Sequence, residues 1–221
     1  MATGMDRLLN DVAFQRPRGA RFDRAVLLAH GAGADMDAAP LRAVADALEV
    51  AGIPSLRFNY PYRSAGKKAP DRPAALEAAT REAVALLALK AKVPPERLVL
   101  GGRSMGGRYC SMLAGATEGA APCLGLLLLG YPLHPAGKPL QLRTEHFPRL
   151  GMPVLFISGT RDALAGRAAL TEAAKKIKGK TEFHWLDEAE HGFRVPKRTG
   201  RTADDVLGDV AAATVEWVMR L

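Results

Sequence analysis

The sequence has little that would place the chain in a membrane or in an oxidising compartment. No apolar run approaches the ~20 residues that a membrane-spanning helix needs, and the longest candidate, 124–129, has the length of a strand. The stretch 1–24 alternates charged and small residues and lacks the apolar core of a signal peptide. Two cysteines, Cys110 and Cys123, cannot build a disulfide framework, and no metal-ligand spacing is present. We therefore expect a cytoplasmic protein, not integral to a membrane, that uses no metal and no cofactor.

Aromatic residues are also scarce, at 6% of the 221 residues, whereas hydrophobic residues make up 48%. That content supports a sizeable core and excludes a disordered chain. Basic residues outnumber acidic residues by 31 to 23, which gives a net charge of +8. Such an excess raises the expectation of a nucleic acid, an anionic lipid or an acidic substrate as partner, without deciding among them.

Short runs rich in leucine or β-branched residues alternate with longer alanine-rich amphipathic stretches. This alternation predicts an α/β fold, a three-layer α/β/α sandwich with a mostly parallel sheet of six to seven strands. The expected strands are 25–29, 55–59, 97–101, 124–129, 153–158 and 181–186. The expected helices lie near 38–51, 73–92, 104–117, 166–177 and 203–220.

The organisation along the chain indicates one unit. The sequence has no internal repeat, low-complexity segment or composition shift that would mark a linker. Residues 1–221 are therefore expected to form a single α/β domain. Residues 1–24 would be an N-terminal arm or an edge strand, with 10–15 as an additional antiparallel strand.

A G-x-S-x-G sequence at 102–106 carries the strongest chemical signal. It follows the apolar strand that ends at Leu100 and opens a helix-forming stretch, which is the strand–turn–helix context of a nucleophile elbow. On so sharp a turn the serine is strained, and its neighbours two positions away must lack a Cβ. A glycine-rich turn without chemistry is the weaker interpretation in this context. The motif therefore predicts Ser104 as a nucleophile.

A serine hydroxyl needs a general base within hydrogen-bond reach. His191 lies just past the last expected strand and before the last helix, which fits the chain order Ser, Asp, His of an elbow-type triad. The competing histidines are His30, His134, His146 and His184.

The third member of such a triad is an acid that orients the imidazole. Asp162 follows the strand 153–158 and lies between Ser104 and His191 in the chain. A helix N-cap is the alternative role for an aspartate in that position. Acidic residues close to His191 in the sequence are rivals that we expect to be solvated, namely Asp187, Glu188 and Glu190.

An acyl-transfer site also needs backbone N–H groups aimed at the developing oxyanion, each worth about 3 kcal/mol in the transition state. One is expected from Met105, directly after the nucleophile. The other is expected from the small-residue segment 30–34, which resembles HGGG-type segments. Ala32 is the favoured donor there, with Gly31 and Gly33 as neighbours.

The chain resembles α/β-hydrolase superfamily members of the small, dienelactone-hydrolase-like kind, and more closely the KANL/Tex-type α/β-hydrolase-like proteins. The resemblance implies a parallel-sheet hydrolase fold and a triad of Ser104, Asp162 and His191. Some relatives of this kind are thought to be scaffold-like, but all three triad positions here hold competent residues. The matching segments are HGAGADM at 30–36, RFNYPYR at 57–63, GGRSMGGR at 101–108, LGYPLHPAGKP at 129–139, GTRD at 159–162 and EHGF at 190–193.

The segment 130–150 occupies the usual lid position of this superfamily. About 20 residues with several prolines cannot build a helical cap, so we expect a minimal α/β-hydrolase fold with an open site. Tyr131, His134 and Arg143 in this loop are candidate substrate contacts, as is Gly31. Packing of the rim is an equally good interpretation of the loop residues.

These residues predict a serine hydrolase that cleaves small ester, thioester or lactone substrates through an acyl-enzyme. The alternative is a non-catalytic α/β-hydrolase-like interaction module with a basic surface. More than half of the net charge of +8 lies in loops that follow expected strands, where α/β sites form. That placement favours a small anionic ester over a nucleic acid as the partner.

Overall fold

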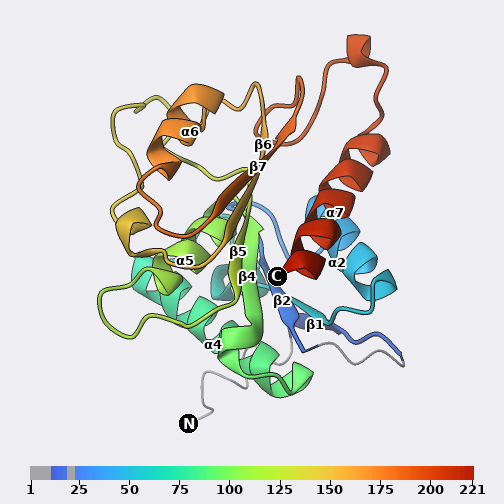
Figure 1. The fold of residues 1–221 in the computed structure, drawn as a ribbon, viewed down its shortest axis with the longest axis vertical. Helices are drawn as coiled ribbons and strands as arrows, with labels where there is room; N and C mark the ends of the chain where they lie inside the picture. Colours follow the sequence, from blue (N-terminus) through green and yellow to red (C-terminus); the bar gives the residue numbers. More distant parts are fainter. Residues whose placement is uncertain (1–10, 19–22) are drawn as a thin grey trace.

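The computed structural model describes residues 11–18 and 23–221. In this part of the chain, one sheet has the strand order β1-β3-β2-β4-β5-β6-β7 (Figure 1). All neighbouring strands are parallel except β1, which pairs antiparallel with β3. The strands are β1 (Val12–Gln15), β2 (Ala25–Ala29), β3 (Ser55–Phe58), β4 (Leu98–Arg103), β5 (Gly125–Leu129), β6 (Val154–Gly159) and β7 (Thr181–Leu186).

The helices cover both faces of the sheet, which confirms the three-layer α/β/α prediction. On one face lie α2 (Ala39–Val50) and α7 (Ala203–Arg220), side by side in Figure 1. The other face carries α4 (Pro73–Ala91), α5 (Met105–Ala114) and α6 (Arg167–Ala174). Shorter helices are α3 (Pro61–Ser64), η1 (Pro95–Arg97), η2 (Phe147–Arg149) and η3 (Lys197–Thr199).

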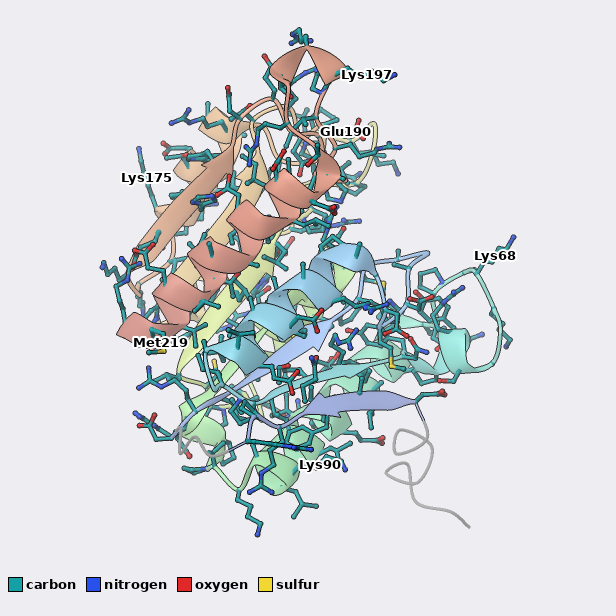
Figure 2. All side chains as sticks on the ribbon, turned by 90° about the vertical axis from the view of Figure 1, so that its right-hand side faces the viewer. Lys68, Lys90, Lys175, Glu190, Lys197 and Met219 are labelled. Carbon is teal, nitrogen blue, oxygen red and sulfur yellow. The ribbon has the colours of Figure 1, made fainter. Side chains whose placement is uncertain are left out.

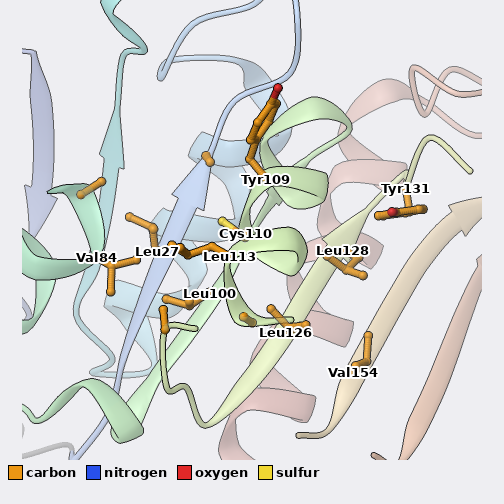
Figure 3. Packing of buried hydrophobic residues seen from close by; sticks show 14 of the residues in the cluster. Leu27, Val84, Leu100, Tyr109, Cys110, Leu113, Leu126, Leu128, Tyr131 and Val154 are labelled. Carbon is orange, nitrogen blue, oxygen red and sulfur yellow. The ribbon is translucent and has the colours of Figure 1, made fainter. Parts of the chain in front are cut away.

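The strands are apolar on both faces because both faces are covered. Along β2, Leu27 packs in the core under α4 and α5, whereas Val26 and Leu28 pack in the core under α2 and α7. Leu27 pairs with Leu100 of β4 in the register of the sheet, and Leu100 pairs with Leu126 of β5. Figure 3 shows these three leucines beside α5. Their packing fixes α5, and with it the turn that precedes α5, over the centre of the sheet.

Both cysteines behave as small interior residues. The Cys110 thiol is buried on α5 and donates to the Gly101 carbonyl at 3.3 Å. Burial raises the pKa of Cys110, and it raises the pKa of Cys123 to about 12. Neither thiol is therefore ionised near neutral pH.

The strand order reverses direction at β2, which has β3 on one side and β4 on the other. At such a switch point the loops after the two adjacent strands diverge and leave room for a site. Here these loops are the segment 30–37 after β2 and the turn between β4 and α5. Both begin at the carboxyl edge of the sheet, where the sequence predicts the chemistry.

The two long loops turn out differently. The segment 130–150 contains only the single turn η2, so the fold has no cap domain, as expected. The segment 60–72 contains the short helix α3, which the sequence pattern did not predict.

The N-terminal prediction is only partly open to comparison. Val12–Gln15 forms the expected antiparallel edge strand, whereas residues 1–10 and 19–22 lie outside the described residues. Among the helices of the described residues, none has the length and apolar character needed to cross a membrane.

Candidate active site

Ser104 occupies the turn between β4 and α5 in a strained conformation. Its backbone angles are φ 49° and ψ −112°, outside the regions that a residue with a side chain prefers. The Ser104 N–H donates to the Leu129 carbonyl of β5 at 2.9 Å, which holds the turn against the sheet. Strain of this kind collects at functional sites, where the surrounding structure enforces it.

The glycines on either side of Ser104 let the backbone of β2 approach the turn. A Cβ on Gly102 would lie 2.1 Å from the Ala29 carbonyl oxygen, and a Cβ on Gly106 would lie 2.3 Å from the same atom. Both contacts are far shorter than any real Cβ contact. The steric reason for glycine at these two positions is therefore the one that the motif predicts.

Ser104, His191 and Asp162 form a continuous hydrogen-bonded chain. Ser104 Oγ lies 2.9 Å from His191 Nε2, and His191 Nδ1 lies 2.8 Å from Asp162 Oδ2. The Asp162 side chain is fully buried, whereas the His191 side chain keeps 26% of its surface exposed. Three residues from the turn after β4, the loop after β6 and the loop after β7 thus meet at one edge of the sheet.

The second carboxylate oxygen of Asp162 fixes the orientation of the first. Asp162 Oδ1 accepts the Leu164 N–H at 2.8 Å, so the carboxylate is held from both sides. The N-cap of α6 is Gly166, so Asp162 does not cap that helix. The expected rivals have other partners: Glu188 pairs with Arg161 and Arg198, Glu190 pairs with Arg194, and Asp187 accepts from Thr160.

The segment 30–34 lies against the elbow. A Cβ on Gly31 would lie 3.5 Å from Ser104 Cβ, so the backbone of this segment adjoins the serine. Met105 is the first residue of α5, where backbone N–H groups have no partner within the helix. In residues 11–18 and 23–221, neither the Met105 N–H nor the Ala32 N–H donates a hydrogen bond.

His30 holds that segment in place. The side chain is fully buried, its Nδ1–H donates to the Gly31 carbonyl at 2.8 Å, and its Nε2 accepts the Tyr60 N–H at 3.1 Å. Burial lowers the pKa of His30, which keeps the ring neutral. Both ring nitrogens are therefore occupied, and His30 supports the loop rather than Ser104.

A second serine–histidine pair involves Ser111, two turns further along α5. Ser111 Oγ is 2.8 Å from His146 Nε2, but the Ser111 hydroxyl donates its only proton to the Arg108 carbonyl. His146 Nε2 must then carry a proton and donate it to Ser111. Burial, with Arg108 nearby, lowers the pKa of His146 to about 4. This buried pair packs the interior and does not activate its serine.

The remaining histidines also have local partners. His184 Nε2 lies 2.7 Å from Asp209 Oδ1 between β7 and α7, and His134 Nδ1 lies 2.9 Å from the Pro135 carbonyl. The Tyr131 hydroxyl donates to the Arg143 carbonyl at 2.6 Å, and its ring is almost fully buried. Of the four candidate substrate contacts, the structure brings Gly31 next to Ser104. Tyr131 and His134 use polar atoms within their own loop, and their contact with substrate stays a prediction.

Arg103 is the residue whose place the sequence did not predict. In the sequence, Arg103 adds to the positive charge of the segments that follow the strands. In the structure, its side chain instead donates a hydrogen bond to the His191 carbonyl. The available signal was its position, because a charged residue at the end of an otherwise apolar central strand is unusual.

Comparison with known proteins agrees with this fold. A family model described as "Alpha/beta hydrolase domain" matches residues 22–219. The chain belongs to the α/β hydrolase family. KANL/Tex-type closeness remains a prediction of the sequence.

Solved structures share the fold of this α/β hydrolase at low sequence identity. An esterase from Thermogutta terrifontis with bound butyrate has a TM-score of 0.71 and 18% identity, covering 95% of this chain and 88% of its own. A dienelactone hydrolase from Anabaena variabilis has a TM-score of 0.61 and 21% identity, covering 95% and 90%. A serine hydrolase without a lid from Xanthomonas campestris has a TM-score of 0.62 and 20% identity, covering 94% and 88%.

The contact between Gly106 and Ala29 predicts the effect of adding one methyl group. Gly106→Ala in this α/β hydrolase should lower the free energy of unfolding by about 2 kcal/mol, because the new Cβ overlaps backbone that cannot move aside. Gly208→Ala is the matched control: Gly208 is exposed on α7 and a Cβ there meets nothing. It should raise stability by about 0.5–1 kcal/mol. Urea unfolding measures both, and a Gly106→Ala protein as stable as wild type contradicts the expectation.

The buried His146 predicts a loss of stability at acid pH. Its pKa is about 4 in the folded state against an ordinary 6.5, so the unfolded chain binds the proton first as the pH falls. The free energy of unfolding should therefore decrease between pH 6.5 and 4. His146→Gln keeps a donor for Ser111 but cannot titrate, so its decrease should be smaller. Chemical unfolding, with each protein referred to its own value at pH 8, tests this; identical slopes would refute it.

Proposed function

We propose that this α/β hydrolase is a serine hydrolase that cleaves small ester, thioester or lactone substrates through an acyl-enzyme. The observation that carries the proposal is the chain from Ser104 Oγ through His191 to the buried Asp162, with the serine on a strained elbow. Membership of the family supports a hydrolytic function. The proposed chemistry needs neither a metal nor a cofactor, and we propose that residues 1–221 act as one domain.

In the first half-reaction, Ser104 Oγ attacks the substrate carbonyl while its proton passes to His191 Nε2. The carbonyl oxygen becomes an oxyanion, which accepts hydrogen bonds from the Met105 and Ala32 N–H groups. His191 then gives the proton to the departing alcohol, thiol or ring oxygen, and the acyl group remains on Ser104. In the second half, His191 takes a proton from water, the hydroxide attacks the acyl-enzyme, and Ser104 recovers its proton.

Asp162 acts through His191 rather than on the substrate. Its carboxylate accepts from Nδ1, so the proton stays on that nitrogen and the lone pair of Nε2 faces Ser104. The same carboxylate stabilises the imidazolium that forms when Nε2 takes the serine proton. Burial of the Asp162 side chain strengthens both effects, because little water screens the interaction.

The absence of a cap domain supports small, readily exchanged substrates. The segment 130–150 has one helical turn and folds back on itself, since Tyr131 bonds to Arg143 within it. The T. terrifontis esterase was solved with butyrate and with propionate bound. We therefore propose short acyl groups for this chain.

Basic residues in loops that follow the strands support an anionic substrate. Arg63 pairs with Asp35, whereas Lys67 and Lys68 are exposed on the loop after α3. Figure 2 shows Lys68 projecting from that loop, away from the sheet. Arg108 lies one helical turn after Ser104 on α5. Its Nε atom is buried without a hydrogen-bond partner in the described residues, so this atom is not exposed to a bound substrate, and Arg108 contributes only its positive charge near the elbow.

Labelling with a fluorophosphonate probe tests the nucleophile. Ser104→Ala should abolish labelling and lower kcat/KM for p-nitrophenyl acetate by at least about 10⁴-fold, because the attacking oxygen is gone. Ser111→Ala is the control, since Ser111 also contacts a histidine but gives its proton elsewhere. It should label like wild type.

The pattern of labelling separates the alternatives. Wild type without label would contradict the proposed activity and favour the non-catalytic interaction module. Equal labelling of wild type and Ser104→Ala would place the nucleophile elsewhere.

A pair of esters tests the charge preference. The mono-p-nitrophenyl ester of adipic acid and its methyl-capped diester have similar length and differ in charge. At low ionic strength, kcat/KM for the anionic ester should exceed that for the neutral diester by about 10-fold, and the ratio should fall as salt is added. A ratio of one at low salt would remove the role of the basic residues in substrate choice.

A further inference from the structure

Arg103 links the nucleophile strand to the loop that carries His191. It is the last residue of β4, directly before Ser104. Its Nη2 donates to the His191 carbonyl, and its Nη1 lies 3.4 Å from the Leu129 carbonyl of β5. The guanidinium also stacks over the Phe193 ring, with its central carbon 4.7 Å from the ring centroid. One side chain thus ties two central strands to both sides of the turn at 191–193.

The surrounding backbone is shaped to admit this guanidinium. Gly130 has φ +57°, and a Cβ there would lie 2.6 Å from Arg103 Nη1. Phe193 has φ 64°, a left-handed conformation that costs a non-glycine residue on the order of 1–3 kcal/mol. That conformation turns the ring toward Arg103. A left-handed glycine and a left-handed phenylalanine therefore lie beside the same side chain.

Arg103 also places a positive charge beside the imidazole. Its polar contacts in the described residues go to two carbonyl oxygens and to the His191 ring, not to a carboxylate. Burial lowers the pKa of Arg103 to about 10 while Asp162 opposes the shift, so the side chain remains cationic near neutral pH. Its Nη1 lies 3.5 Å from His191 Nε2. A charge at that distance disfavours a second positive charge on the ring.

The groups that face His191 divide by element. Asp162 approaches Nδ1 from the loop after β6, and Ser104 and Arg103 approach Nε2 from the end of β4. The acids of its own loop have other partners: Glu190 pairs with Arg194, Glu188 pairs with Arg161 and Arg198, and Asp187 accepts a hydrogen bond from Thr160. Asp162 and Arg103 are thus the opposed charges in contact with the imidazole.

We propose that Arg103 is a positioning residue for His191. It ties the His191 loop to β4 and β5 and disfavours protonation of the resting imidazole, so that a neutral base faces Ser104. This inference rests on the proposed function, because it assigns a role to Arg103 only if His191 is the general base.

The test compares Arg103→Met, Arg103→Lys and the control Arg42→Met, whose arginine is exposed on α2. The readout is kcat and KM for the neutral ester p-nitrophenyl butyrate from pH 5 to 9. Arg103→Met should move the acid limb of kcat/KM upward by about one pH unit and lower the plateau kcat by about 10–100-fold. KM should change by less than about threefold.

Arg103→Lys separates charge from geometry. It keeps the cation but loses the planar fork and the stack on Phe193, so the acid limb should stay within about 0.3 pH unit of wild type. The plateau kcat should fall by about 10-fold. Arg42→Met should match wild type throughout.

Each outcome bears on one of the two proposals. An Arg103→Met plateau that falls without movement of the acid limb, or a profile equal to wild type, overturns the role of Arg103. Should Arg103→Met fail to fold by circular dichroism, Arg103→Lys decides: a wild-type kcat overturns the proposal and the expected loss supports it. Absence of Ser104-dependent hydrolysis in wild type contradicts the proposed function, whereas hydrolysis indifferent to Arg103 contradicts this inference alone.

Discussion

The site depends on the close approach of the elbow to the carbonyl of Ala29. Gly102 and Gly106 meet this atom from either side of Ser104, at distances that no Cβ could occupy. The elbow is held from the other side as well, because the Ser104 N–H bonds to Leu129 of β5. Ser104 is therefore confined between β2 and β5, and its strained φ and ψ follow from this confinement. The same approach brings the segment 30–34, which continues from Ala29, against the serine.

Around this fixed serine, one imidazole lies between the buried Asp162 carboxylate and the half-buried Arg103 guanidinium. Asp162 lies on the Nδ1 side and Arg103 near the Nε2 side. A carboxylate alone would favour a protonated ring, and a guanidinium alone would oppose the protonation that follows serine attack. In the proposed reaction, the two charges therefore act on the imidazole in opposite directions. The arrangement also explains why Arg103 need not form a salt bridge, since its hydrogen bonds go to carbonyls that the fold already places there.

Much of the fold can be predicted from the sequence because the central strands are apolar on both faces. The runs at 25–29 and 124–129 differ by at most one residue from β2 and β5. The three residues of the hydrogen-bonded chain also follow from local signals, namely a glycine-framed turn and two loops after strands. α3 escaped prediction because four residues cannot display a helical period. The orientation of the Arg103 side chain could not be predicted either, because it depends on Gly130 and Phe193, which are 27 and 90 positions away in the chain.

Charge counting illustrates the same limit. Arg103 and Arg63 both lie in loops or strand ends at the carboxyl edge of the sheet, and both add to the formal net charge of +8. In the fold, Arg103 turns beneath His191 and Arg63 faces Asp35. A formal charge informs substrate choice only after its internal partners are known; Lys67 and Lys68, in contrast, are exposed.

The two serine–histidine pairs along α5 differ in where the proton of the serine hydroxyl goes. Their Oγ–Nε2 distances, 2.9 Å and 2.8 Å, are nearly the same. At Ser111 the hydroxyl proton is already committed to a carbonyl, and the buried His146 has no hydrogen-bonded carboxylate in the described residues. At Ser104 the hydroxyl has no other acceptor within the part of the chain that the structure describes, a buried carboxylate fixes the tautomer of His191, and the ring keeps contact with solvent. The Oγ–Nε2 distance alone does not decide whether a histidine can activate a serine. What decides it is whether the hydroxyl proton points to the histidine, and this depends on the groups that hold the other side of the imidazole.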